Sequence, residues 1–261
     1  MNPISPDTFQ LVIIESLRPN DSKTAQKLYH EIIKYKQYQE VNLHSVLHVI
    51  KTQKELIQIL SKLNEEIIGG GPFPILHLEM HGYEDGIQLT SGEIILWIDL
   101  MPFLRNINVT LKHRLLIILG ACEGLNLGVR HDINERAGFA IIISCDSQIR
   151  ESDALAAFEA FYDCYFSEAD LAASLNRMNL AIEGNSLFSI LPANEFFDRL
   201  VNPNSTWIDF EAEKEAKFFQ EKYPLVSMEI LKIRSRHQIL SLLETWQEKK
   251  PFFIMSDLQS D

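Results

Sequence analysis

Residues 115–124 read LLIILGACEG, an apolar run that ends in a cysteine flanked by small residues. A run without alternating polar positions is typical of a strand buried on both faces, as in a parallel sheet covered by helices. Comparable runs occupy 9–17 (FQLVIIESL, closed by the turn Arg18-Pro19-Asn20-Asp21), 73–80 (FPILHLEM) and 139–144 (FAIIIS). These four runs predict the core of an α/β domain.

Amphipathic patterns separate the runs. Helical spacing of apolar residues predicts helices at 22–36, 52–67, 98–106, 152–166 and 169–182. Further strands are expected at 41–50 and 186–191, with a hairpin outside the main sheet at 83–96. Parallel neighbours need crossover connections, so this alternation predicts a three-layer fold with a mostly parallel sheet flanked by helices. The charged segment after Thr206 predicts a helical C-terminal extension. We therefore expect a domain at 1–205 and an extension at 206–261 that packs on it or docks to a partner.

Composition narrows the function classes. The 261 residues carry 24 Lys and Arg against 36 Asp and Glu, a formal charge of −12. Such a field repels phosphate backbones and anionic membrane surfaces, so we expect no nucleic acid and no membrane as partners. No apolar stretch reaches the roughly 20 residues of a membrane span, and no basic segment precedes the first apolar run. These features, with three cysteines lacking staple-like spacing, predict a cytoplasmic protein with reduced thiols.

Two chemically competent residues follow neighbouring runs. His81-Gly82 comes after the run at 73–80 and Cys122 after the run at 115–121. The carboxyl ends of parallel strands share an edge, where active sites of such sheets lie. A thiol needs a nearby imidazole to become a nucleophile, so His81 and Cys122 are the candidate catalytic residues. The backbone N–H groups of Gly82 and Cys122 are candidate oxyanion donors, and Gly124 is expected to let the chain turn sharply after Cys122.

These motifs resemble the caspase-like (clan CD) cysteine peptidases, which include caspases, metacaspases, separases and bacterial CHAT proteins. Ala121, Cys122 and Gly124 fit the caspase pattern Gln-Ala-Cys-x-Gly, whereas glycine at position 120 disfavours a true caspase and its aspartate specificity. The closer similarity is to CHAT-domain proteases, over about residues 9–191, through the features Ala137-Gly138 and Ser152-Asp153.

The resemblance implies a caspase-like fold and a protease (a peptide-bond hydrolase) with a His/Cys dyad. It also implies regulation by a protein partner or a ligand, and a possible place in bacterial antiviral defence or cell death. The rival hypothesis is a catalytically silent scaffold of the same fold that binds a protein partner.

Acidic residues near the dyad suggest how a substrate would bind. Asp146 and Asp153 resemble the region of metacaspases where an acid lines the primary pocket, and Glu123 adjoins Cys122. A carboxylate there would pair with a basic residue before the scissile bond. The alternative is that Asp153, behind Ser152, only opens its helix, where an acid is favoured by the helix dipole.

The segment HLEMH at 77–81 superficially suggests a zinc motif. Its glutamate is in the third position rather than the second, and in a strand positions 77, 79 and 81 share one face. Zinc would also need further ligands that the sequence does not provide. We therefore expect no metal and no cofactor.

Overall fold

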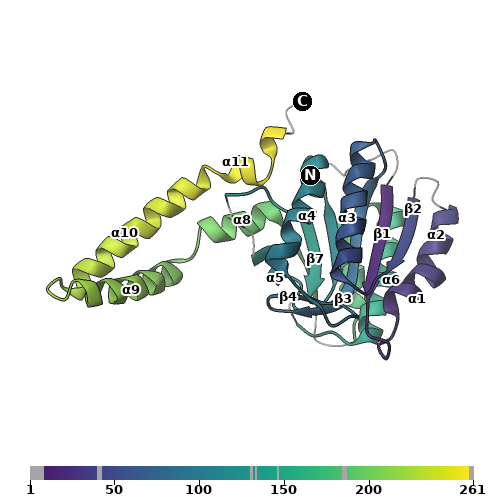
Figure 1. The fold of residues 1–261 in the computed structure, drawn as a ribbon, viewed down its shortest axis with the longest axis horizontal. Helices are drawn as coiled ribbons and strands as arrows, with labels where there is room; N and C mark the ends of the chain where they lie inside the picture. Colours follow the sequence, from purple (N-terminus) through teal and green to yellow (C-terminus); the bar gives the residue numbers. More distant parts are fainter. Residues whose placement is uncertain are drawn as a thin grey trace.

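The computed structural model describes residues 9–39, 43–129, 132, 134–145, 147–183 and 187–258. Its centre is a sheet with the strand order β2-β1-β3-β6-β7-β8 (Figure 1). These strands are β1 (Phe9–Ser16), β2 (Leu43–Val49), β3 (Phe73–Tyr83), β6 (Leu116–Gly120), β7 (Ile141–Cys145) and β8 (Phe188–Pro192). Neighbours from β2 to β7 are parallel, and β8 is antiparallel to β7. The predicted mostly parallel α/β sheet is thus confirmed.

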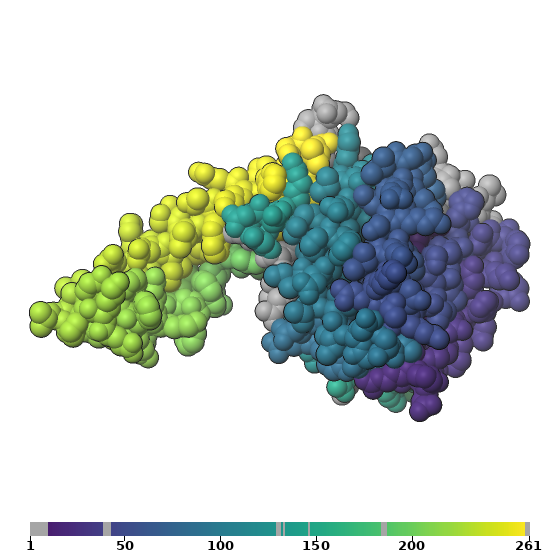
Figure 2. All heavy atoms as spheres, in the orientation of Figure 1, coloured from purple at the N-terminus to yellow at the C-terminus, as the bar shows by residue number. Residues whose placement is uncertain are grey.

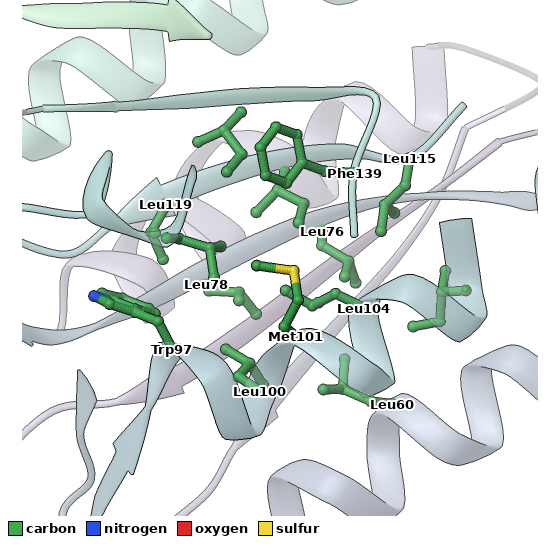
Figure 3. Close-up of a cluster of buried hydrophobic side chains, with 14 of the residues drawn as sticks. Leu60, Leu76, Leu78, Trp97, Leu100, Met101, Leu104, Leu115, Leu119 and Phe139 are labelled. Atoms are coloured by element: carbon green, nitrogen blue, oxygen red, sulfur yellow. The ribbon is translucent and has the colours of Figure 1, made fainter. Parts of the chain in front are cut away.

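Helices cover both faces because successive side chains of the buried strands point to opposite sides. Val12 and Ile14 of β1 belong to the core beneath α3 (Gln53–Ile68) and α4 (Trp97–Thr110). Figure 3 shows part of this core, in which Leu76 and Leu78 of β3 lie near Leu100, Met101 and Leu104 of α4.

The opposite face carries a second core. Leu11 and Ile13 of β1 belong to it, together with buried aromatic residues of α6. The helices on this side are α1 (Thr24–Leu28), a π-helical turn (Tyr29–Ile33), α2 (Lys34–Gln39), α6 (Glu151–Glu168) and α7 (Leu171–Leu180). The three predicted layers are therefore present.

The first helical segment differs from the single helix predicted at 22–36. It begins at Thr24, and Ser22 does not cap it. The Ser22 N–H donates to Glu151, and the Ser22 hydroxyl accepts from Lys27. Contacts to other side chains therefore take the place of a cap, and residues 17–23 remain a turn.

The predicted hairpin consists of β4 (Gly86–Gln88) and β5 (Ile94–Leu96). It is not separate from the sheet, because β4 pairs antiparallel with residues 81–83 at the end of β3. This pairing extends β3 beyond Met80, where the sequence pattern predicted its end. His81 therefore lies within a strand and not in a loop after it.

The C-terminal region is helical, as predicted. It contains α8 (Ala193–Val201), α9 (Ser205–Lys222), α10 (Met228–Gln247), α11 (Lys250–Phe253) and a 3-10 turn (Ser256–Leu258). The α9–α10 hairpin projects from the sheet and its covering helices (Figures 1 and 2). After it, α11 returns to the body, where the buried Phe253 ring lies 5.0 Å from that of Phe197.

A membrane span would need a long and continuously apolar helix. Among the residues that the structure describes, no helix meets both conditions.

Candidate active site

The register of β3 and β6 brings the two predicted catalytic segments together. Glu79 is paired with Gly120, so His81 and Cys122, each two residues further along, leave adjacent strands at the same edge. Gly82 lies directly beneath the chain at Cys122. A Cβ atom built on Gly82 would be 2.0 Å from the Cys122 carbonyl oxygen and 2.9 Å from the Ala121 Cβ. Only glycine permits this close approach.

Cys122 is a free, partly exposed thiol at a sharp turn. The residue with a left-handed backbone is Glu123, at φ 57°, and not Gly124. Left-handed backbone is unfavourable for a residue with a Cβ. Gly124 is required for a different reason, since a Cβ there would be 2.3 Å from the Ser144 hydroxyl oxygen. The expected sharp turn is present, but its strain lies one residue earlier than the sequence suggested.

His81 makes a hydrogen bond that sequence analysis did not anticipate. Its Nε2 lies 2.8 Å from Oδ2 of Asp21, which belongs to the turn after β1. The same carboxylate oxygen accepts a hydrogen bond of 2.7 Å from the Arg18 backbone N–H. An ionised carboxylate only accepts, so Nε2 carries the proton and Nδ1 is left as the basic nitrogen.

The electrostatics of Asp21 favour its ionised form. Burial alone would raise the pKa of this carboxyl, but the hydrogen bonds from His81 and the Arg18 N–H outweigh it. The net effect is a pKa below its usual value. Asp21 is therefore a carboxylate at neutral pH, able to orient the imidazole and to stabilise its protonated form.

The signal that could have found Asp21 was its place directly after a buried strand. Sequence analysis treated Arg18-Pro19-Asn20-Asp21 only as a turn. The structure shows that β1 is the immediate neighbour of β3, so this turn meets the end of β3.

A second charged group lies at the same rim. Nη2 of Arg18 is 2.5 Å from the side-chain oxygen of Gln88 and 3.4 Å from the Tyr83 hydroxyl. Gln88 is directly opposite His81 in the β3–β4 pairing. The exposed guanidinium of Arg18 therefore contacts Gln88, the residue paired with His81. A basic group thus also lies at this rim, whereas the sequence led us to expect acids there.

The structure describes two of the three candidate substrate-binding acids. Asp153 is 6% exposed in the first turn of α6, with its Oδ2 2.8 Å from Nε of Arg150. This geometry fits the helix-opening alternative, because the carboxylate is already paired. Glu123 lies beside Cys122, partly buried. Asp146 lies outside the described residues.

An open pocket of about 550 Å³ adjoins the Asp21 turn. It is formed between this turn with α1 and the start of α6, and its lining is Ser22, Thr24, Lys27, Glu151, Ser152, Leu155, Ala156 and Glu159.

The other polar residues of β3 form a buried cluster behind the rim. His77 is fully buried, with Nδ1 2.7 Å from the Tyr162 hydroxyl and Nε2 3.4 Å from Oε2 of Glu79. Within the described part of the chain, no three His, Cys, Asp or Glu side chains are placed to hold a metal ion. HLEMH thus forms part of a strand, with His77 and Glu79 inside and His81 at the edge.

Comparison with known proteins adds no further assignment. No family model matches this chain, and no curated protein matches it.

Proposed function

We propose that this protein is a caspase-like cysteine endopeptidase that uses Cys122 as nucleophile and His81 as base. The observation that carries the proposal is that His81, oriented by Asp21, and Cys122 lie at the ends of two paired strands, at the same edge of the sheet. An imidazole oriented by a carboxylate and placed next to a thiol is the arrangement that cysteine-dependent acyl transfer requires.

In the proposed reaction, Nδ1 of His81 takes the proton of the Cys122 thiol, and the sulfur attacks the scissile carbonyl carbon. The carbon–nitrogen bond breaks, the departing amine takes the proton from His81, and the peptide acyl group remains as a thioester. A water molecule, deprotonated by His81, then attacks this thioester. The products are a free carboxylate and the regenerated thiol. Asp21 holds the ring and balances its positive charge.

The backbone of Gly82 suits the oxyanion role. The two-residue turn Glu84-Asp85 joins Tyr83 to Gly86, and such a turn closes on a hydrogen-bonded pair. Because bonded and non-bonded pairs alternate in antiparallel strands, Gly82 and Ile87 form a non-bonded pair. The Gly82 N–H therefore points away from β4 and is not used in the β3–β4 pairing. An N–H in this position can donate to the developing oxyanion.

The wider biology rests on the resemblance alone. We propose a protein substrate, control by a partner or a ligand, a cytoplasmic location and a role in bacterial defence or cell death. The carboxylate of Asp153 is paired with Arg150, and that of Asp21 is paired with His81. Neither carboxylate is therefore free to bind a basic side chain of a substrate. The specificity is best measured with an unbiased panel.

Covalent trapping tests the proposal. Peptide acyloxymethyl ketones ending in Arg, Lys, Asp or Leu would be incubated with the full chain, and the labelled residue would be mapped by mass spectrometry. We expect a label on Cys122 that is lost in Cys122→Ala and His81→Ala. Cys164→Ala is the matched control, because Cys164 is a buried thiol on α6. Labelling that survives Cys122→Ala would refute the nucleophile.

One observation favours the alternative of a catalytically silent binding scaffold. The projecting α9–α10 hairpin exposes large apolar side chains, among them Trp207, Phe210, Phe218, Ile230 and Ile233. The two functions are separated by the reactivity of Cys122 toward iodoacetamide at pH 7. An activated thiol reacts faster than free cysteine, whereas a scaffold without catalytic function would show an ordinary or slower rate.

A further inference from the structure

The segment at residues 22–26, which follows Asp21, is held by three carboxylates from three different elements. Thr24 donates its hydroxyl hydrogen bond to Oε1 of Glu79 on β3. The Gln26 backbone and side chain both donate to Glu15 on β1. The Ser22 N–H donates to Glu151 on α6 at 3.2 Å. Residues 22–26 thus form hydrogen bonds to β1, β3 and α6.

One of these carboxylates is buried with an oxygen that lacks a hydrogen-bond partner, which is unfavourable for stability. Glu79 is 3% exposed, and its Oε2 has no hydrogen-bond partner within the described structure. The groups that face it are His77 on its own strand, Thr24 on α1, Glu15 on β1, Glu151 on α6 and the nearby Tyr162. Burying a carboxylate next to other acids is unfavourable, and an apolar side chain of similar size would stabilise the fold better.

The placement of Glu79 indicates why a carboxylate is present there despite its unfavourable burial. Glu79 and His81 point to the same face of β3, two residues apart. Thr24 and Asp21 are three residues apart on the neighbouring turn. Two parallel contacts therefore join the same two elements, Asp21 with His81 at the rim and Thr24 with Glu79 behind it. The tip of this turn, at Arg18 to Asn20, is exposed. Its described contact with β3 is the 3.4 Å hydrogen bond between two exposed side chains, from the Arg18 guanidinium to the Tyr83 hydroxyl.

We infer that Thr24 and Glu79 are positioning residues, whose hydrogen bond fixes the Asp21 turn against β3 and so keeps Asp21 bonded to His81. Without that inner contact the exposed turn could shift, and a shift of about 1 Å is enough to lose a hydrogen bond of normal length. Neither residue touches the reacting atoms. The inference rests on the proposed function only in that His81 serves as the base.

The Nε2–H proton of His81 tests the inference independently of any substrate. This proton gives an NMR signal when a hydrogen bond protects it from exchange with water, and the signal would be assigned in the full-length protein with His81→Gln. Asp21→Ala removes the acceptor and should abolish the signal. Thr24→Val, which removes only the hydroxyl, should weaken or abolish it as well. Thr24→Ser, which retains the hydroxyl, should restore the wild-type signal.

Two variants of Glu79 separate the hydrogen bond from the charge. Glu79→Gln removes the charge but keeps an oxygen that can accept from Thr24, so the Nε2–H signal of His81 should stay close to that of the wild type. Glu79→Leu removes the acceptor without leaving a cavity, and should weaken the signal as Thr24→Val does. Equal weakening in the two variants would show that the charge acts directly and would overturn the positioning role.

Kinetics give a second readout. Thr24→Val should lower kcat on the peptide found by trapping by about tenfold with KM unchanged, because it disturbs the base and not substrate binding. Thr110→Val is the matched control, since it removes a threonine hydroxyl that bonds Asn64 between α4 and α3, away from the candidate site. A wild-type Nε2–H signal of His81 in a folded Thr24→Val protein would refute the inference. Absence of trapping in every protein including the wild type, with the changes in the Nε2–H signal present, would refute the peptidase proposal and leave the positioning intact.

Discussion

The carboxylate of Asp21 lies 2.8 Å from the imidazole Nε2 of His81, although 60 positions separate the two residues in the chain. This contact exists because β1 and β3 are neighbours, so that the turn after β1 meets the end of β3. It assigns the proton to Nε2 and leaves Nδ1 for exchange with a nucleophile. The same contact makes the role of Asp21 measurable.

Replacing Asp21 by asparagine should reduce kcat/KM about 10- to 100-fold. A hydrogen bond to a charged partner contributes about 1.5–3 kcal/mol, which corresponds to that range of rates. Steady-state kinetics on the trapped peptide sequence would measure the loss. Asp153→Asn is the control, because Asp153 is paired with Arg150 and not with the dyad. A similar loss in both variants would mean that general destabilisation, and not orientation of His81, is responsible.

The same substitution should change how stability depends on pH. The pKa of Asp21 is lower in the folded protein than its usual value of 3.8. Its contribution to stability is therefore present above pH 3.8 and is lost as the pH falls through the folded-state pKa. Urea unfolding of wild type and Asp21→Asn should show wild type to be more stable at pH 6, with the difference shrinking toward pH 3. A difference that does not vary with pH would contradict the ion pair.

Gly82→Ala should destabilise the fold by about 1–3 kcal/mol, the usual cost of inserting a methyl group into tightly packed structure. The new Cβ would meet the Cys122 carbonyl oxygen at 2.0 Å, so the chain at Cys122 has to move. If Cys122 is the proposed nucleophile, its thiol should then react more slowly than in the wild type. Chemical unfolding and iodoacetamide kinetics would record the two effects. Gly69→Ala, whose Cβ contacts are 3.4 Å or longer, should leave both nearly unchanged.

Glu79 should produce a pH dependence of the opposite sign. Burial raises the pKa of Glu79 above its usual value of 4.5; His77 offsets part of this rise, and Glu15 and Glu151 add smaller increases. A raised folded-state pKa gives a contribution that is complete below pH 4.5 and is lost as the pH rises through the folded value. Between pH 4.5 and pH 7, the free energy of unfolding of Glu79→Gln should therefore increase relative to that of the wild type. Parallel stability curves for the two proteins would contradict a buried carboxyl with a raised pKa.

Local pattern was enough to place most strands. The apolar runs at 9–17 and 115–121 became β1 and β6 with ends within about one residue, because a strand buried on both faces has few polar positions to confuse the reading. The end of β3 was placed too early. Its last three residues are held by pairing with β4, and the preference of one segment for another is not visible in either segment alone.

The candidate site divides in the same way. His81 and Cys122 were identified from chemistry and from their place after buried runs, which needed no knowledge of neighbours. The acidic residues could not be assigned by the same means. The sequence around an aspartate does not show which side chain will be its partner. Asp153 pairs with Arg150 and Asp21 pairs with His81, and neither pairing is indicated by the local pattern.

The residues alone determined the alternation of buried strands and amphipathic helices, and the presence of a thiol and an imidazole at strand ends. The strands and helices follow from local periodicity, because a buried face requires an apolar residue at every second position of a strand and at every third or fourth position of a helix. The tertiary structure decided the strand order, and with it the contact of Asp21 with His81 and the contact of Thr24 with Glu79 behind it. These contacts join elements distant in the chain, and they form only when the whole sheet with its covering helices buries enough apolar surface to hold them.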